Sequence, residues 1–172
     1  MALTPALTRH IRRPKLFASL DEVTRSSGQP AGPVFDVSNP STGELLATLP
    51  DMGIDDARTA IDAAALAQPL WAGKPAKDRS IILRRWHDLI VEHADDLAAI
   101  LTAEMGKPLG EAKGEVLHAA SYVEWYAEEA KRVYGETFPA PANDRRMLVI
   151  KQPVGVVGTI TPWNFPASMV AR

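Results

Sequence analysis

The stretch that decides the fold is QPVGVVGTITPWNFPASMVAR, residues 152–172. Within it, Val156–Thr161 has no polar side chain except threonine, which is typical of a strand buried on both faces of a parallel sheet. The sequence PWNFP follows at 162–166, and Pro166 suits the first turn of a helix. These pieces predict a strand, a loop and a helix start in an α/β fold. Because open α/β sheets bind ligands at the carboxyl ends of their strands, the loop is a candidate site.

The composition is that of an ordinary globular domain, with 46% apolar and 23% charged residues among 172. A net charge of −2 gives no reason to expect a nucleic-acid partner. No apolar run approaches the roughly 20 residues that span a bilayer, so no membrane segment is expected. The chain has no cysteine, which excludes disulfides and thiolate metal sites. No metal site is predicted, because no two of the four histidines have helical metal-site spacing.

Residues 1–20 contain four basic residues and no acid. Such a segment could be a mitochondrial transit peptide. A basic, poorly ordered terminus is the favoured interpretation, because Pro5 and Pro14 interrupt any amphipathic helix. The expected compartment is therefore the cytoplasm, with the mitochondrial matrix as the alternative.

Short strands and four helices are expected upstream of the C-terminal stretch. The strands 34–37 and 44–49 flank a turn at Asn39–Gly43 and predict a hairpin. The first helix is expected to begin at the N-cap Asp55 and to end at Pro69. The others are expected at 78–93, at 94–105 with Gly106 as its C-terminal cap, and at 109–134.

Three of the four expected helices carry an apolar stripe at helical spacing. The first has Ala57, Ile61 and Ala64, and the second has Ile82, Leu83, Trp86, Leu89 and Ile90. The expected buried stripe of the fourth is Ala112, Val116, Ala119, Val123, Ala127 and Ala130. The paired carboxylates of these helices are expected to face solvent.

The end of the chain is expected to be irregular over 134–144 and to form a strand over 146–152. A strand buried on both faces needs parallel neighbours joined by helical crossovers, and no crossover follows Val156–Thr161. We therefore expect the N-terminal part of a larger protein. The predicted divisions are an N-terminal extension (1–33), a first part of a cofactor-binding domain (34–135), an oligomerisation segment (136–153) and the strand, loop and helix start (154–172).

The run Pro153–Pro166 resembles the aldehyde dehydrogenase superfamily, whose pattern here is PxGVxxxIxPWNFP. The turn Asn39–Gly43, the segment Glu104–Pro108 and the run Glu111–Glu115 are also similar to the family, so the resemblance covers about residues 34–172. It implies an incomplete Rossmann-like cofactor domain, a mostly helical N-terminal part and a strand segment for oligomerisation. In this family context, Glu104 and Lys107 are interpreted as structural.

The resemblance also implies roles for the loop. Asn164 matches the asparagine whose amide donates to the oxyanion of a thiohemiacetal. Together with Asn164, the residues that match positions lining the cofactor, NAD or NADP, are Ile160, Thr161, Pro162 and Trp163. In such enzymes a cysteine thiolate attacks the aldehyde and a glutamate activates the hydrolytic water. Since the 172 residues contain no cysteine, they are expected to be inactive alone.

Arg172 lies eight positions beyond Asn164, where relatives acting on succinate semialdehyde carry an arginine. The resemblance implies an aldehyde substrate with a distal carboxylate, which a guanidinium can hold bidentately. A plain surface charge is the alternative, and glutarate semialdehyde stays open as the substrate. Residues 146–152 resemble the region through which subunits pair, implying a dimer or tetramer. The alternative function is a non-catalytic interaction module that pairs with full-length subunits.

Overall fold

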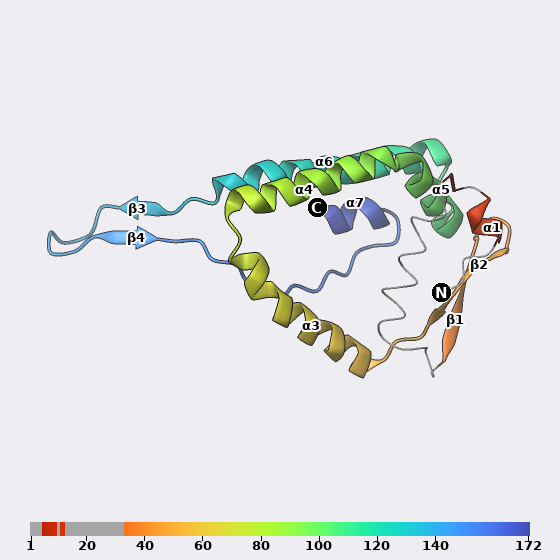
Figure 1. Ribbon diagram of the computed structural model, residues 1–172, viewed down its shortest axis with the longest axis horizontal. Helices are drawn as coiled ribbons and strands as arrows, with labels where there is room; N and C mark the ends of the chain where they lie inside the picture. The colour runs from red at the N-terminus through yellow and green to blue at the C-terminus, as the bar shows by residue number, and fades with distance from the viewer. Residues whose placement is uncertain (1–4, 10, 13–32) are drawn as a thin grey trace.

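The computed structural model describes residues 5–9, 11–12 and 33–172. These residues form mainly helices, with two small antiparallel sheets (Figure 1). The helices are α1 (Pro5–Thr8), α3 (Ile54–Ala72), α4 (Ala76–Glu92), α5 (Ala94–Met105), α6 (Leu109–Glu129), a 3-10 turn η1 (Ala130–Arg132) and α7 (Pro166–Ala171). The strands are β1 (Val34–Ser38), β2 (Leu45–Pro50), β3 (Glu136–Phe138) and β4 (Met147–Val149).

The hairpin β1–β2 forms where the sequence predicts it. Its strands pair antiparallel, with Phe35 opposite Leu49. In the turn, the Asn39 side-chain oxygen accepts hydrogen bonds from the backbone N–H groups of Ser41 (2.9 Å) and Thr42 (3.3 Å). Gly43 then adopts a φ of 72°, which favours glycine. Local turn chemistry is therefore sufficient to explain this element.

The described part of the N-terminal extension packs against the body of the protein. Ile11 is buried in a cluster with Leu46 and Ala103, and the Arg12 backbone N–H donates to Asp96 Oδ1 at 2.8 Å. The expectation of a poorly ordered terminus is therefore wrong for residues 11–12. The rest of that expectation falls largely on residues outside the described part of the chain.

Helix α3 differs from its prediction at both ends. The helix begins after Gly53, and Asp56 rather than Asp55 caps its N-terminus. The Asp56 carboxylate accepts a hydrogen bond from the Gly53 N–H at 2.8 Å. Pro69 lies inside the helix, which continues to Ala72. Proline removes its own backbone donor but can still accept, and the Gly73 N–H donates to the Pro69 carbonyl at 2.9 Å. No residue of α3 is buried within the described structure, so its apolar stripe is uncovered.

The helices α4, α5 and α6 form the central packing unit (Figure 1). Alanines at the α5–α6 contact, including Ala98 and Ala112, are fully buried and allow the helix backbones to approach closely. The predicted α6 stripe is buried from Ala112 to Ala127. Helix α5 ends at Gly106, whose φ is 82°, as expected. Helix α6 is shorter than predicted because the chain tightens into η1 after Glu129.

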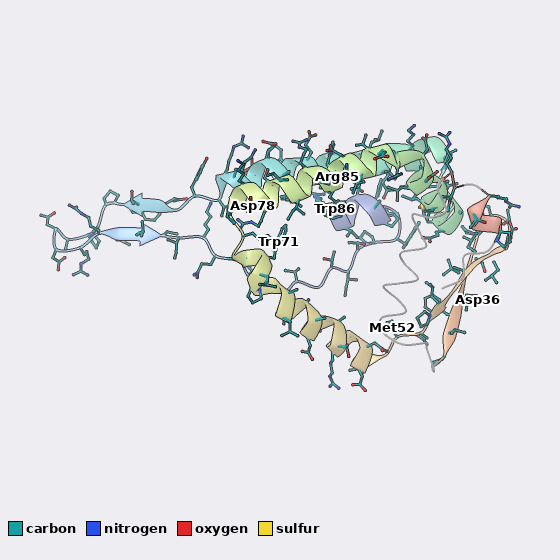
Figure 2. The ribbon with its side chains drawn as sticks, in the orientation of Figure 1. Asp36, Met52, Trp71, Asp78, Arg85 and Trp86 are labelled. Carbon is teal, nitrogen blue, oxygen red and sulfur yellow. The ribbon has the colours of Figure 1, made fainter. Side chains whose placement is uncertain are left out.

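The predicted apolar face of α4 is only partly covered. Leu83 and Ile90 are half-buried, whereas Ile82, Trp86 and Leu89 are exposed. Figure 2 shows Trp86 on the side of α4 that faces α7. Periodicity identifies the apolar face of α4 but does not supply a partner that covers it.

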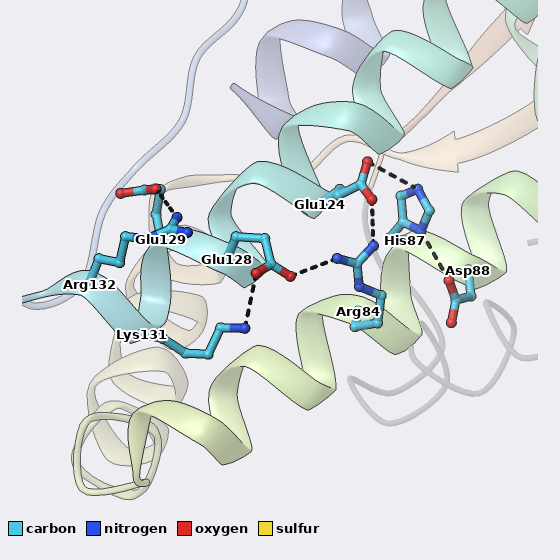
Figure 3. Close-up of polar contacts among 8 residues, drawn as sticks. All are labelled: Arg84, His87, Asp88, Glu124, Glu128, Glu129, Lys131 and Arg132. Atoms are coloured by element: carbon cyan, nitrogen blue, oxygen red, sulfur yellow. Dashed lines mark hydrogen bonds and ion pairs between the residues drawn. The ribbon is translucent and has the colours of Figure 1, made fainter.

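A charge network joins α4 to α6 (Figure 3). Arg84 donates to Glu124 at 2.6 Å and to Glu128 at 2.8 Å. Lys131 also contacts Glu128, at 3.0 Å. Hydrogen bonds from Lys131 and from Arg84 lower the pKa of the Glu128 carboxyl below its ordinary value. The network therefore adds charged contacts along one side of the helix pair.

The strands β3 and β4 form a hairpin that projects away from the helices (Figure 1). Glu136–Phe138 lies in the stretch expected to be irregular, so that expectation is wrong, and β4 is shorter than the predicted strand 146–152. The segment contains only one β-branched residue, so its composition does not predict a strand. Its strand conformation follows from pairing with Met147–Val149. All six strand residues are exposed.

The segment 154–161 is not a strand in the structure, which contradicts the central expectation for Val156–Thr161. It runs beside the helices without strand pairing, and Ile160 is 100% exposed. A strand obtains its backbone hydrogen bonds from neighbouring strands. Both sheets in the described structure pair other residues, so the segment lacks that partner.

Candidate functional site

The predicted loop 162–166 leads directly into α7, which packs against α6 (Figure 1). Pro166 is the first residue of α7, as the sequence predicts. A proline there costs no backbone hydrogen bond, because the first N–H groups of a helix have no intrahelical partner. The Met169 N–H donates to the Phe165 carbonyl at 3.1 Å. The local sequence thus determines where α7 begins.

The backbone of the loop is held by two charged residues from the α5–α6 region. Lys107 Nζ donates to the Asn164 carbonyl at 2.8 Å and lies 4.0 Å from the centre of the Phe165 ring. Glu115 forms an ion pair with Lys107 and accepts hydrogen bonds from the N–H groups of Ala167 (2.9 Å) and Ser168 (3.3 Å). The five residues from Asn164 to Ser168 therefore have a fixed course.

The side-chain amide of Asn164 has no hydrogen-bond partner among the described residues, although its backbone carbonyl does. The residue is exposed at the turn before α7. An amide held this way can donate to an oxygen of a bound molecule. The geometry is compatible with the predicted oxyanion role, which stays a prediction.

The four residues before Asn164 form an open surface. Ile160 is fully exposed and Trp163 is 79% exposed. Thr161 is half-buried and Pro162 is exposed. This arrangement offers apolar side chains and a hydroxyl on one stretch of chain, a combination typical of a wall of a ligand site.

A pocket of about 510 Å³ lies between α6 and α7, and we call it the α6–α7 pocket. Its walls include Arg172 and Met169 on the α7 side and His118 and Tyr122 on the α6 side. The rings of His118 and Tyr122 are 4.9 Å apart. The Arg172 backbone carbonyl accepts a hydrogen bond from Tyr126 Oη at 2.6 Å, which anchors the end of α7. The pocket thus places a guanidinium beside aromatic side chains, and the charged residues Lys107, Glu111 and Glu115 also line it.

Trp163 lines a different cavity, an apolar groove of about 550 Å³ between α7 and the helices α4 to α6. Glu104 lies at the same groove, and burial raises the pKa of its carboxyl above the ordinary value. The predicted site residues are therefore near one another in the chain but face two cavities: Trp163 faces the apolar groove, and Arg172 faces the α6–α7 pocket.

Sequence reasoning missed the role of Glu115 and the pocket position of His118. Lys107 was expected to be structural, but not to contact Asn164. The signal for Glu115 was weak, because a carboxylate in a charged helix usually faces solvent.

Among the described residues, no group of three potential metal ligands comes together. A search of the described helices found none that is long and apolar enough to cross a membrane.

Comparison with known proteins shows the family to which the chain belongs. Residues 27–172 match the model of the aldehyde dehydrogenase family, so the chain belongs to this family. It is 65% identical over all 172 residues to a probable succinate-semialdehyde dehydrogenase [NADP(+)] of Sinorhizobium fredii, covering 35% of that protein. It is 55% identical over 82% of its length to a glutarate-semialdehyde dehydrogenase of Pseudomonas putida, covering 29% of it.

A solved structure shows the same likeness. The crystal structure of succinate-semialdehyde dehydrogenase from Burkholderia pseudomallei aligns with a TM-score of 0.79 at 55% identity. The alignment covers 81% of this chain and 29% of that one. The expected fold, the N-terminal part of the aldehyde dehydrogenase fold, is thereby confirmed. The chain spans about a third of the length of the curated relatives that it matches.

Proposed function

We propose that the protein carrying this segment is an NADP-dependent aldehyde dehydrogenase that oxidises a small aldehyde with a distal carboxylate, succinate semialdehyde first. The observation that carries the proposal is the free side-chain amide of Asn164 on a backbone fixed by Lys107 and Glu115. The relatives named for succinate semialdehyde and NADP support the substrate and cofactor. Cytoplasm stays the expected compartment, with the mitochondrial matrix as the alternative.

The residues present fit one wall of a nicotinamide dinucleotide site. Ile160 and Trp163 offer uncovered apolar surface, and Thr161 adds a hydroxyl. When bound, the cofactor accepts the hydride. In this proposal Ile160, Thr161, Pro162 and Trp163 bind and orient it, and Asn164 contributes a donor at the same wall.

Asn164 supplies the chemistry proposed for this segment. A negative charge develops on the aldehyde oxygen when a thiolate attacks the carbonyl carbon. The amide N–H of Asn164 donates to that oxygen and stabilises the charge, and a single donor of this kind contributes about 3–4 kcal/mol. The 172 residues contain no cysteine to provide the thiolate. We therefore expect residues 1–172 alone to be inactive.

The experiment that tests this role is the Asn164→Ala variant of the whole protein, measured by NADP reduction with succinate semialdehyde. We expect kcat to fall by about 10²–10³-fold, because the charge is stabilised only in the transition state. Asn143→Ala is the matched control, since Asn143 is an exposed asparagine in the loop between β3 and β4. Equal kcat for Asn164→Ala and wild type would overturn the proposal.

Arg172 is proposed to hold the distal carboxylate in the α6–α7 pocket. A hydrogen bond to a charged group contributes about 1.5–3 kcal/mol, so Arg172→Gln should lower kcat/KM for succinate semialdehyde by about 10–100-fold. The same variant should change kcat/KM for butanal little, because butanal has four carbons and no carboxylate. An equal loss with both aldehydes would show that Arg172 acts on the fold or only as a surface charge. Comparing succinate with glutarate semialdehyde in the wild type separates the two candidate substrates.

A non-catalytic interaction module is the second candidate function, favoured by the projecting hairpin β3–β4. Its exposed side chains include Phe138 and Met147, which share one face of the hairpin, and Leu148 on the other face. Exposed apolar side chains of this kind suit pairing with another subunit. We expect the whole protein to be a dimer or tetramer through this hairpin. Failure of residues 1–172 to associate with subunits of the whole protein in light scattering would reject the module, and a Leu148→Asp variant would test whether the hairpin carries the pairing.

A further inference from the structure

Lys107 and Glu115 form an ion pair that is almost completely removed from solvent. The side chain of Lys107 is 9% exposed and that of Glu115 is 2% exposed. Removing two charges from water is costly, so buried pairs persist where further hydrogen bonds satisfy both groups. Among the described residues, those hydrogen bonds go to one short stretch of backbone, Asn164–Ser168.

Lys107 fixes the first part of that stretch. Its ammonium group has three N–H donors. One donates to Glu115 and another to the Asn164 carbonyl at 2.8 Å. The same ammonium lies over the Phe165 ring, 4.0 Å from its centre, which adds a cation–π attraction. Two consecutive residues of the loop are therefore held by one side chain.

Glu115 fixes the second part. Its Oε1 accepts from the N–H groups of Ala167 and Ser168, whereas its Oε2 contacts Lys107. The first N–H groups of a helix have no intrahelical acceptor, so the carboxylate satisfies donors that α7 leaves free. The two residues together attach the loop and the start of α7 to α6.

We propose that Lys107 and Glu115 are positioning residues that set the direction of the Asn164 side chain in the aldehyde oxidation proposed above. Both side chains also line the α6–α7 pocket, so a change in KM would indicate contact with the substrate, whereas a change in kcat alone indicates positioning. Their contacts fix the Asn164 carbonyl and the first N–H groups of α7, so the backbone that carries the Asn164 side chain has one position from which the amide can reach the oxyanion. An oxyanion donor is effective only when it is already oriented toward the charge that develops.

The test is a mutant cycle in the whole protein with Lys107→Met/Glu115→Gln and Asn164→Ala. The double substitution removes both charges at nearly constant volume, so neither charge is left buried alone. We expect it to lower kcat by at least about ten-fold with little change in KM, because a small misplacement of a catalytic group costs up to about 100-fold. In the Asn164→Ala background the same substitution should lower kcat by about two-fold or less, since residues acting as one unit are not additive.

Lys113→Met is the matched control. Lys113 lies on α6, as Glu115 does, and forms an ion pair with Asp95 at 2.6 Å that is half-exposed. We expect its kcat to equal that of the wild type in both backgrounds. Circular dichroism of every variant reports whether the fold is retained. If the double variant does not fold, Lys107→Arg, which retains a cation beside Glu115, is judged by the same criterion of non-additivity.

The outcomes separate this inference from the proposed function. Loss of kcat that is equal in the presence and absence of Asn164 would overturn the positioning role, because the pair would then act on the fold alone. Wild-type kcat in a folded Lys107→Met/Glu115→Gln protein would overturn it as well. Absence of aldehyde oxidation by the wild type would reject the proposed function instead, and the thermal midpoints would still show whether the pair supports the fold.

Discussion

The helix pair α5–α6 and the extended segment 154–161 are both rich in small and apolar residues, yet they have opposite environments. Val116 on α6 is 2% exposed, whereas Val157 in the extended segment is 67% exposed. A helix forms its hydrogen bonds within its own backbone and needs a partner only for its apolar face. A strand needs a partner for its backbone as well. The comparison shows why α5 and α6 can pack within this chain while 154–161 lies unpaired.

The largest expected effect on the free energy of unfolding comes from making the same substitution in both regions. Val116→Ala removes two methyl groups from the α5–α6 core and should lower the free energy of unfolding by about 1.5–3 kcal/mol. Val157→Ala removes the same atoms from an exposed site and should change it by less than about 0.5 kcal/mol. Urea denaturation measures both. Equal losses would show that Val157 is buried in the whole protein, in the strand that the sequence predicts.

The next effect compares two glycines. Gly106 ends α5 with a φ of 82°, and a Cβ there would lie 3.2 Å from Pro40 Cγ. Gly106→Ala should therefore lower the free energy of unfolding by about 1–2 kcal/mol. Gly158→Ala has no heavy atom within 4 Å of the new Cβ and should be neutral or slightly stabilising. Thermal denaturation of the two variants would contradict this ranking if Gly158→Ala lost more stability.

The smallest effect compares two arginines. Arg84 joins α4 to two carboxylates of α6, whereas Arg145 pairs with its sequence neighbour Asp144 at 2.8 Å. Neighbours in sequence also meet in the unfolded chain, so Arg145→Met should leave stability unchanged. Arg84→Met should lower it by a small amount that high salt removes, because the pair is partly exposed. Denaturation at low and high ionic strength measures the difference.

The contribution of Arg84 should also depend on pH. The pKa of Glu128 is lowered in the folded protein, so the stabilisation is present above its ordinary value of 4.5 and is lost as the pH falls through the lower, folded pKa. The difference between wild type and Arg84→Met should therefore shrink below about pH 4.5. A difference that grows in acid would contradict the assigned hydrogen bonds.

Much of the helical part could be predicted from local patterns. The α6 stripe from Ala112 to Ala127 and the cap at Gly106 follow from spacing and from the preference of glycine for positive φ. Pro69 misled the prediction, because a proline near the end of a helix need not terminate it. Residues 136–138 were missed, because their partners in β4 lie nine to thirteen positions away, beyond a short-range pattern.

The candidate site likewise contains residues that the sequence predicts and contacts that only the structure shows. The loop PWNFP and the family resemblance identified Asn164 and the residues before it, and the same resemblance singled out Arg172. Lys107 and Glu115 could be read as family positions or surface charges, but their contacts with Asn164–Ser168 join residues more than fifty positions apart. No local pattern encodes such a contact. The family itself is confirmed by comparison, while the roles of the individual residues stay predictions.

By itself, the sequence determined the family, the start of α7 at Pro166 and the buried face of α6, because these depend on motif, on proline geometry and on helical periodicity. Only the tertiary structure decided that 154–161 lies unpaired and that a buried ion pair holds Asn164. The physical reason is that strand pairing and charge burial depend on partners distant in the chain, whereas helix caps and stripes depend on neighbours.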